Sequence, residues 1–226
     1  MKNAILGLAV LGLTTFPAIA MAEEPVPEWS FNAGVISDYV YRGFSQTDGD
    51  AAVQGGIDFN YGPFYAGTWA STVDFGDGTD LEWDFYAGVT GTAGGLDYDV
   101  GLTYFTYVGA PDGSDYNLVE FKLGLSKTID ALTIGGAVYY SPDFFGIDEQ
   151  ATYVEATIGY AIDDKWSLSG GVGRQYLDVG TDYNSWNAGV GYAFTENLAL
   201  DLRYWDSGVR SSLSDARVTV GIGVSF

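Results

Sequence analysis

Glu82 and Asp84 are the first residues in this chain whose types and spacing suggest chemistry. They lie in the stretch "LEWDFYAG" at positions 81–88, and in an extended strand residues i and i+2 project from the same face. Paired carboxyl groups can perform acid–base catalysis when their environments separate their pKa values. The chain contains no histidine, however, which removes the commonest general base. The simpler interpretation is a pair of charges on one polar strand face, so we expect no enzyme and no cofactor.

Acidic residues dominate the rest of the charge pattern. The chain has 30 Asp and Glu against 9 Lys and Arg, and its formal net charge is −21. A nucleic-acid partner is therefore not expected, because phosphate binding requires a basic surface. The stretch "DFGDGTD" spaces Asp74, Asp77 and Asp80 loosely like calcium ligands, but it lacks the twelve-residue pattern and terminal Glu of an EF-hand. We therefore expect no dedicated metal site.

The elements that must position these residues are strands. The last residues, "ARVTVGIGVSF", alternate an apolar set with a small polar set, and a period of two is typical of a strand whose faces meet different environments. The same alternation recurs in "AVQGGIDFNY", "LDYDVGLTYF" and "NLVEFKLGLS". Counting such segments predicts twelve strands.

Two kinds of connector alternate between these segments. Short ones, such as Gly62-Pro63 and Gly94-Gly95, are compatible with tight hairpin turns. Longer ones, such as 45–51 and 206–215, all carry carboxylates. An even number of antiparallel strands with short turns at one end and longer acidic loops at the other is therefore expected.

The N-terminus predicts export. Lys2, the apolar run "AILGLAVLGLTTFPAIA" and the small-residue pattern Ala20-Met21-Ala22 together form a secretory signal peptide. We assign residues 1–22 to this signal, 23–28 to a periplasmic N-terminal segment and 29–226 to the folded domain. Cysteine is absent, so no disulfide supports the fold.

Two architectures fit alternating strands. A soluble β-sandwich would bury the apolar faces between two sheets, whereas a membrane β-barrel turns them toward lipid and lines its interior with polar residues. Charges and glycines on the polar faces favour the barrel. So do aromatic residues near strand ends, which would form two interfacial girdles; the candidates are Trp69, Trp83, Trp166, Trp186, Tyr192, Phe194, Tyr204 and Trp205.

Two resemblances make the barrel interpretation more specific. The final strand resembles the C-terminal strand of bacterial outer-membrane barrels, which ends on an aromatic residue that the barrel-assembly machinery recognises; here Phe226 would be that signal. The run "SDYVYRGFSQTDGDAAVQGGIDF" (37–59), with "FYAGTWASTVDFGDG" (64–78) and "LEWDFYAG" (81–88), resembles the TorF-type porins of Gram-negative bacteria. The resemblance implies an outer-membrane, porin-like protein. In that membrane it would contact lipid and lipopolysaccharide, and its loop carboxylates would either be solvated or share divalent cations with the lipopolysaccharide phosphates.

We therefore expect a channel through which small hydrophilic solutes diffuse, either cation-preferring or suited to zwitterions. Its expected lining comprises Arg42, Asp58, Glu82, Asp84, Asp97, Asp99, Glu120, Lys122, Glu155, Asp201, Arg203 and Arg217. The alternative is a non-conducting barrel that anchors or adheres and has a blocked lumen.

The heights of the arginines in the barrel suggest a more detailed hypothesis. With Arg42 at the top of the first strand, a wall formed by Arg42, Arg203 and Arg217 would face carboxylates across the lumen and orient dipolar solutes. The competing interpretation is local neutralisation, in which Arg203 and Arg217 pair with Asp38 or Asp201 on neighbouring strands.

Overall fold

The computed structural model describes residues 25–226. The signal peptide assigned to residues 1–22, and the first residues of the N-terminal segment, lie outside this range. Within residues 25–226, no helix has the length and apolar character needed to cross a membrane.

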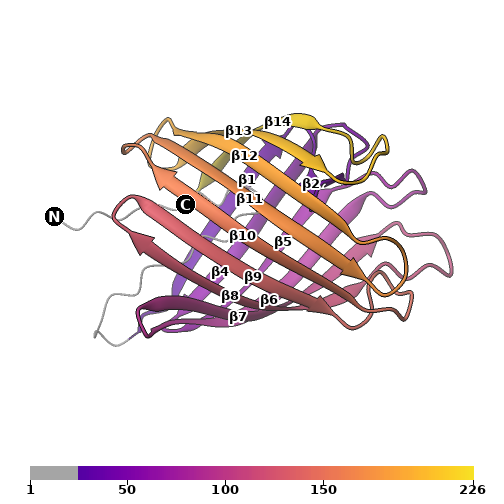
Figure 1. Ribbon diagram of the computed structural model, residues 1–226, viewed down its shortest axis with the longest axis horizontal. Coiled ribbons are helices and arrows are strands. Elements are labelled where there is room, and N and C mark those ends of the chain that lie inside the picture. The colour runs from indigo at the N-terminus through magenta and orange to yellow at the C-terminus, as the bar shows by residue number, and fades with distance from the viewer. Residues whose placement is uncertain (1–24) are drawn as a thin grey trace.

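The described chain consists of strands and their connections (Figure 1). The strands are β1 (Glu28–Ile36), β2 (Val40–Tyr41), β3 (Phe44–Ser45), β4 (Ala52–Tyr61), β5 (Phe64–Thr72), β6 (Leu81–Ala93), β7 (Leu96–Val108), β8 (Leu118–Ile129), β9 (Leu132–Ser141), β10 (Ala151–Ala161), β11 (Trp166–Leu177), β12 (Tyr183–Ala193), β13 (Leu198–Ser207) and β14 (Arg217–Ser225).

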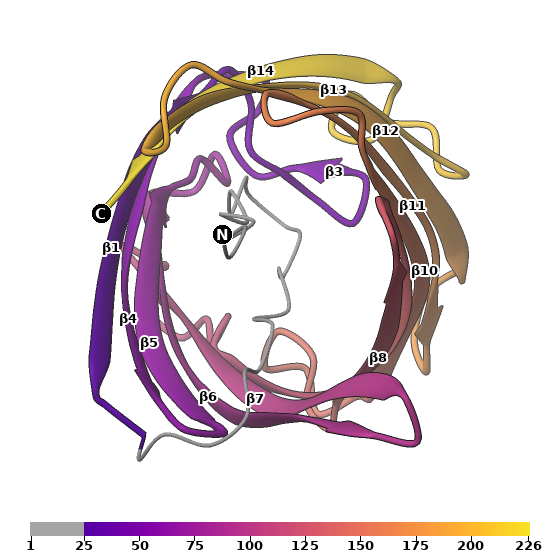
Figure 2. The same cartoon turned by 90° about the vertical axis from the view of Figure 1, so that its left-hand side faces the viewer.

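Twelve of these strands, β1 and β4 to β14, form a closed antiparallel barrel (Figure 2). Each strand pairs with its neighbour in the sequence, and β14 closes the barrel by pairing with β1 in the register Val35↔Ile222. Closure leaves no unpaired sheet edge. The prediction of an all-β barrel of twelve antiparallel strands is confirmed.

The connections at the two ends of the barrel differ as predicted. Tight turns such as Gly62-Pro63 and Gly94-Gly95 join strands at one end, where the glycines adopt positive φ angles of 58°, 61° and 79°. This is the left-handed region that glycine enters without steric cost. The longer connections project from the other end (Figure 1). We call these the short-turn end and the long-loop end.

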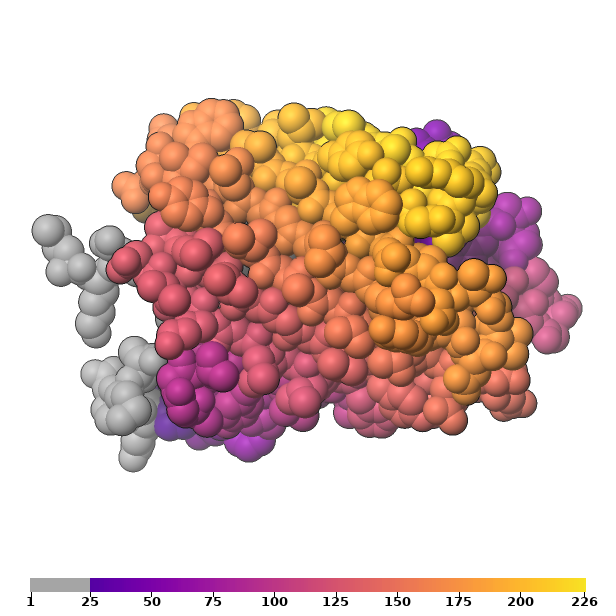
Figure 3. All heavy atoms as spheres, viewed as in Figure 1, coloured from indigo at the N-terminus to yellow at the C-terminus, as the bar shows by residue number. Residues whose placement is uncertain are grey.

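The wall is apolar outside and polar inside. Large apolar side chains such as Trp29, Val53 and Val172 are 63%, 61% and 62% exposed, whereas Gln175 and Glu82 are only 1% and 2% exposed. Figure 3 shows one outer side of the barrel, where side chains cover the strands. The apolar faces of the strands therefore look outward.

Two of the eight aromatic residues assigned to girdles do not lie on that outer surface. The ring of Trp69 lies 5.5 Å from that of Tyr39, in the connection that enters the barrel, and the indole Nε1 of Trp205 donates to buried Thr219 at 3.1 Å. The girdle assignment is therefore wrong for Trp69 and Trp205. Both side chains point inward. Trp69 is two residues from buried Ser71 on β5, and Trp205 is two residues from buried Arg203 on β13.

The first long connection differs most from expectation. Strand β1 ends at Ile36 instead of continuing to Arg42, and residues 37–51 form a separate hairpin from β2 and β3. Figure 2 shows this hairpin inside the ring of barrel strands. The prediction that Arg42 lies at the top of the first barrel strand is wrong.

Candidate functional site

The base of the inserted hairpin is fixed by Asp38. Its carboxylate accepts hydrogen bonds from the Ser45 and Thr47 hydroxyls at 2.6 and 3.1 Å, and it forms an ion pair with Arg217 of β14. Asp38 is 6% exposed. One buried carboxylate thus joins both sides of the hairpin base to the barrel wall.

The tip of the hairpin is held by Arg42. Its Nη2 donates to both carboxylate oxygens of Glu120 on β8 at 2.7 Å, and its Nη1 donates to Oε1 of Gln175 on β11 at 3.2 Å. The rings of Tyr139 and Tyr153 lie 5.1 and 4.3 Å from the guanidinium. Such charge-assisted bonds and ring contacts are strong when desolvated, and the two charged side chains are only 7% and 6% exposed.

The local sequence explains why the chain turns at this point. Arg42 and Gly43 have φ angles of 47° and 88°, as the two central residues of a type I′ hairpin turn require. A side chain at position 43 would place its Cβ 2.9 Å from the Cβ of Ser207 and 3.1 Å from that of Ser185. Glycine therefore allows both the turn and the close approach of the tip to β12 and β13.

A third contact lies on β6. The Tyr39 hydroxyl donates to Glu82 at 3.0 Å, and the Asp84 carboxylate follows on the same inner face. Glu82 and Asp84 are 2% and 6% exposed, and Oδ1 of Asp84 has no hydrogen-bond partner. Across residues 25–226, neither carboxylate forms an ion pair.

The middle of the barrel contains a further buried ion pair. Arg203 contacts Asp201, two residues away on β13, at 3.0 Å, and its guanidinium also donates to Asn187 and Ser169 at 2.6 and 2.7 Å. Arg203 and Asp201 are 3% and 5% exposed. This cluster crosses from β13 to β11, and it neutralises its own charge.

On the opposite wall, Lys122 of β8 contacts Asp99 of β7 at 2.6 Å, and the Tyr65 hydroxyl donates to the same carboxylate at 2.8 Å. Asp58 of β4 accepts a hydrogen bond from the Tyr86 hydroxyl. Tyrosine hydroxyls therefore serve as donors to carboxylates on this inner wall.

Two further carboxylates of the expected lining have hydroxyl donors. Glu155 of β10 accepts from Tyr139 at 2.9 Å, and Asp97, near the short-turn end of β7, accepts from Thr92 at 2.6 Å. Neither forms an ion pair within residues 25–226. Together with Asp58, Glu82 and Asp84, they leave an excess of acidic groups on the inner face.

The structure does not contain the predicted arginine wall. Arg203 pairs with Asp201 and Arg217 pairs with Asp38, as the neutralisation alternative expected, whereas Arg42 reaches Glu120 directly. The hypothesis assumed that all three arginines stand on adjacent strands. It fails because Arg42 belongs to the inserted hairpin.

Several important contacts were absent from the sequence-based site. Tyr39, Tyr139, Tyr153 and Gln175 contact the charged residues, yet their side chains carry no formal charge. One available signal was the Arg-Gly dipeptide at 42–43, which is a possible turn. The other was the position of Tyr139, which lies directly across from the inward-facing Lys122 on the neighbouring strand.

The acidic loop at 73–80 uses its carboxylates to shape the backbone. Asp74 accepts from the Gly76 amide at 2.8 Å and Asp77 from the Thr79 amide at 3.0 Å. The hydrogen bonds from the Thr79 amide and the Tyr116 hydroxyl hold the pKa of Asp77 below its ordinary value. In the part of the chain that the structure describes, no group of three or more acidic residues is arranged to hold a metal ion.

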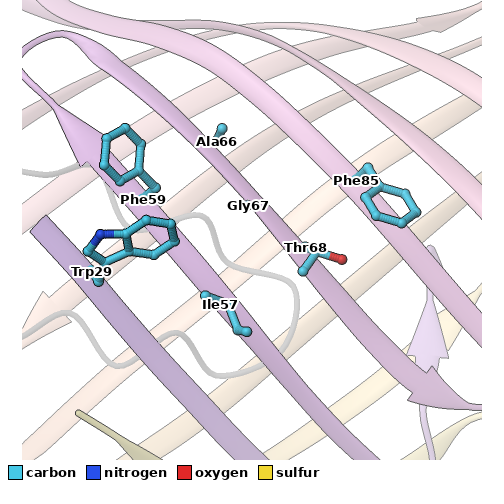
Figure 4. A pocket seen from close by; sticks show the side chains of 7 residues that line it. All are labelled: Trp29, Ile57, Phe59, Ala66, Gly67, Thr68 and Phe85. Carbon is cyan, nitrogen blue, oxygen red and sulfur yellow. The ribbon is translucent and has the colours of Figure 1, made fainter. Parts of the chain in front are cut away.

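A shallow depression lies on the outer wall over β5 (Figure 4). Its floor is formed by Ala66, Gly67 and Thr68, and the larger side chains of the neighbouring strands surround it. These are Trp29, Ile57, Phe59 and Phe85. The depression is on the apolar surface and is separate from the inner charged clusters.

The fold of the chain is similar to that of solved porin barrels. The structure of KdgM porin superimposes with a TM-score of 0.59 at 11% identity, covering 87% of this chain and 98% of that one. NanC porin gives 0.57 at 11% identity, with 88% and 99% covered. An outer membrane channel from Pseudomonas putida F1 gives 0.53 at 9% identity, with 91% and 96% covered. At these identities the similarity shows the fold alone.

Family membership follows from the sequence match. Residues 20–223 match Gcw_chp, a family described as a bacterial protein of unknown function, and the chain belongs to it. No curated protein matches the chain in sequence. The narrower TorF-type resemblance is not tested by these matches and stays a prediction.

Proposed function

We propose that this protein is a porin-like channel of the Gram-negative outer membrane, through which small hydrophilic solutes diffuse. The observation that carries the proposal is a closed twelve-stranded barrel with an apolar outer face and a charged inner face. An outward apolar band matches lipid, and a polar interior matches water. The similarity in fold to KdgM, NanC and the Pseudomonas channel supports the same function.

The inner charges favour cations over anions. The basic side chains Arg42, Lys122, Arg203 and Arg217 each have an acidic partner. The remaining inner carboxylates, Asp58, Glu82, Asp84, Asp97 and Glu155, form no ion pair within residues 25–226. Rings of acidic side chains select cations, so we expect permeation of small cations and zwitterions to exceed that of anions of equal size.

The outer-membrane assignment brings its expected partners. Lipid and lipopolysaccharide would contact the apolar outer face, and the barrel-assembly machinery would recognise the C-terminal strand. Phe226 is 74% exposed, and its backbone forms a reciprocal pair of hydrogen bonds with Phe31 at 3.0 and 2.9 Å. Its ring is thus accessible at the seam between β14 and β1. We keep its role as an assembly signal as part of the proposal.

A specific observation also favours the second candidate, a non-conducting anchoring or adhesive barrel. The hairpin at 37–51 extends from the β14 side to Glu120 on β8 and occupies part of the interior. If it fills the cross-section, solutes cannot pass. The two candidates therefore differ in a single measurable property.

Single-channel recording separates them. The purified, folded protein is inserted into a planar lipid bilayer under a KCl gradient, and the reversal potential is measured. Discrete current steps with a cation-selective reversal potential are expected. Silence from the wild type and from a variant in which a Gly-Ser linker replaces residues 39–46, both shown to be folded by circular dichroism and heat-modifiable migration, would overturn the channel and support a non-conducting barrel. Anion-selective steps would overturn the cation preference alone.

A further inference from the structure

The hairpin lies against one side of the barrel, and its Arg42 side chain reaches the opposite side. Its base is paired with Arg217 on β14 and its tip with Glu120 on β8. In the strand order of the closed barrel, β14 and β8 are six positions apart in either direction, so they lie opposite one another. Gly43 at the tip packs against β12 and β13, so it is the Arg42 side chain that bridges the interior to β8.

The base and the tip are attached in different ways. The base has backbone hydrogen bonds to neighbouring loops, from the Ser45 amide to Leu213 at 2.7 Å and from the Asp74 amide to Gln46 at 2.7 Å. Strands β2 and β3 pair only with each other. The described contacts of residues 40–44 with the barrel wall are made by side chains and by the close packing of Gly43.

The conformation of the tip also depends on those contacts. Arg42 has a φ of 47°, a region that a non-glycine residue occupies only when its surroundings enforce it. The ion pair with Glu120 and the tyrosine rings provide that enforcement. Without them the turn loses its main support, whereas the base keeps the Asp38 cluster.

From this asymmetry we propose that residues 37–51 form a gate in the channel. The tip, residues 40–44, moves on a base fixed at Asp38, and the Arg42–Glu120 ion pair holds the gate in the bridging position seen here. This inference rests on the proposed channel function and assigns its regulation to one hairpin. It names Arg42 and Glu120 as the latch, and Asp38 as the fixed point.

A reversible disulfide tests the movement directly. The chain contains no cysteine, so a Gly43→Cys, Ser185→Cys double variant has no competing thiols. The Cβ positions at 43 and 185 are 3.1 Å apart, close to the 3.5–4.5 Å of a disulfide. The oxidised form should record one steady current level, and reduction should restore transitions to a higher level. The Gly43→Cys single variant controls for strain at the turn.

A latch variant provides the second measurement. Glu120→Gln keeps the shape of the side chain and removes its charge, so the open probability should rise about tenfold, the change that about 1.4 kcal/mol produces. Asp182→Asn is the matched control, because the Arg174–Asp182 pair is exposed, at 44% and 35%, and outside the interior.

The outcomes distinguish the gate from the channel. Identical currents in the oxidised and reduced double variant, together with unchanged gating in Glu120→Gln, would overturn the gate and leave the channel intact. A silent wild type with a conducting Glu120→Gln would support both. Silence in every folded variant, including one with residues 39–46 replaced by a Gly-Ser linker, would overturn both the channel and the gate.

Discussion

The same strands form both faces of the barrel wall, but the two faces meet different environments. On β10, the outward Ile158 is 52% exposed. On the inward face of the same strand, Glu155 accepts a hydrogen bond from Tyr139, and the ring of Tyr153 lies 4.3 Å from the Arg42 guanidinium. The outer face has apolar side chains, many of them exposed and some in ring contact with one another, such as Trp29 and Phe59. The inner face has buried charged groups, most of which have ion-pair or hydrogen-bond partners.

The specific polar interactions of this fold lie on the inner face of the barrel. The outer face requires only apolar character, because lipid adapts to its shape. The inner face requires exact partners, because a buried charge without compensation is costly. Substitutions should therefore be tolerated outside when they stay apolar, and inside when they stay polar and leave the buried ion pairs intact.

The largest effect is expected from breaking a buried inner ion pair. Asp201→Asn leaves the Arg203 guanidinium, which is 3% exposed, without its carboxylate and should lower the free energy of unfolding by about 3–5 kcal/mol. Asp182→Asn breaks an exposed ion pair and should cost no more than about 1 kcal/mol. Urea unfolding in lipid vesicles measures both, and equal losses would contradict the distinction between the faces.

Lysine substitutions at two neighbouring positions of β10 test which face of the strand points toward lipid. Ile158→Lys places a charge toward lipid and should cost about 2–4 kcal/mol if the residue lies near the bilayer midplane. Thr157→Lys points the same side chain into the interior, near Glu155, and should cost much less. The same unfolding assay applies. A larger loss for Thr157→Lys would mean that the two faces had been assigned the wrong way round.

The sequence predicted much of the fold and less of the site, for one physical reason. A period of two identifies the strands and divides each into two faces, and turn residues such as Gly94-Gly95 give the connectivity. Neither depends on distant partners. The site depends on residues brought together by closure of the barrel, such as Arg42 and Glu120, whose separation in the sequence carries no pairing information.

The hairpin shows this limit most clearly. Residues 36–44 do not divide into two faces, because one phase mixes Ile36 and Val40 with Asp38 and Arg42. What ends β1 is the set of tertiary contacts of Asp38 with Ser45, Thr47 and Arg217. The local signal, Gly43, indicates a turn but does not indicate that the turn enters the barrel.

A smaller effect is expected from glycines that accommodate inner tyrosines. A Cβ at Gly88 would overlap the Tyr65 ring, whereas a Cβ at the inward Gly159 would meet only the Thr133 Cβ at 4.0 Å. Gly88→Ala should therefore lower stability by about 1–3 kcal/mol through overpacking. Gly159→Ala is the matched control, with little expected change. If both variants unfold at the same urea concentration, tight Tyr–Gly packing does not contribute to the inner face.

The smallest effect concerns a turn outside the membrane-spanning strands. Asp163, between β10 and β11, accepts hydrogen bonds from the Lys165 and Trp166 amides, both at 2.8 Å, and these lower its pKa below the ordinary value of 3.8. A lowered pKa in the folded state means that the stabilisation is complete above about pH 4 and is lost as the pH falls further. Asp163→Asn should therefore lower the melting temperature slightly at pH 7 and have less effect at pH 2. An equal decrease in melting temperature at pH 7 and pH 2 would show that the charge of Asp163 does not stabilise this turn. The stability of the barrel would then rest on the ion pairs and hydrogen bonds of its inner face.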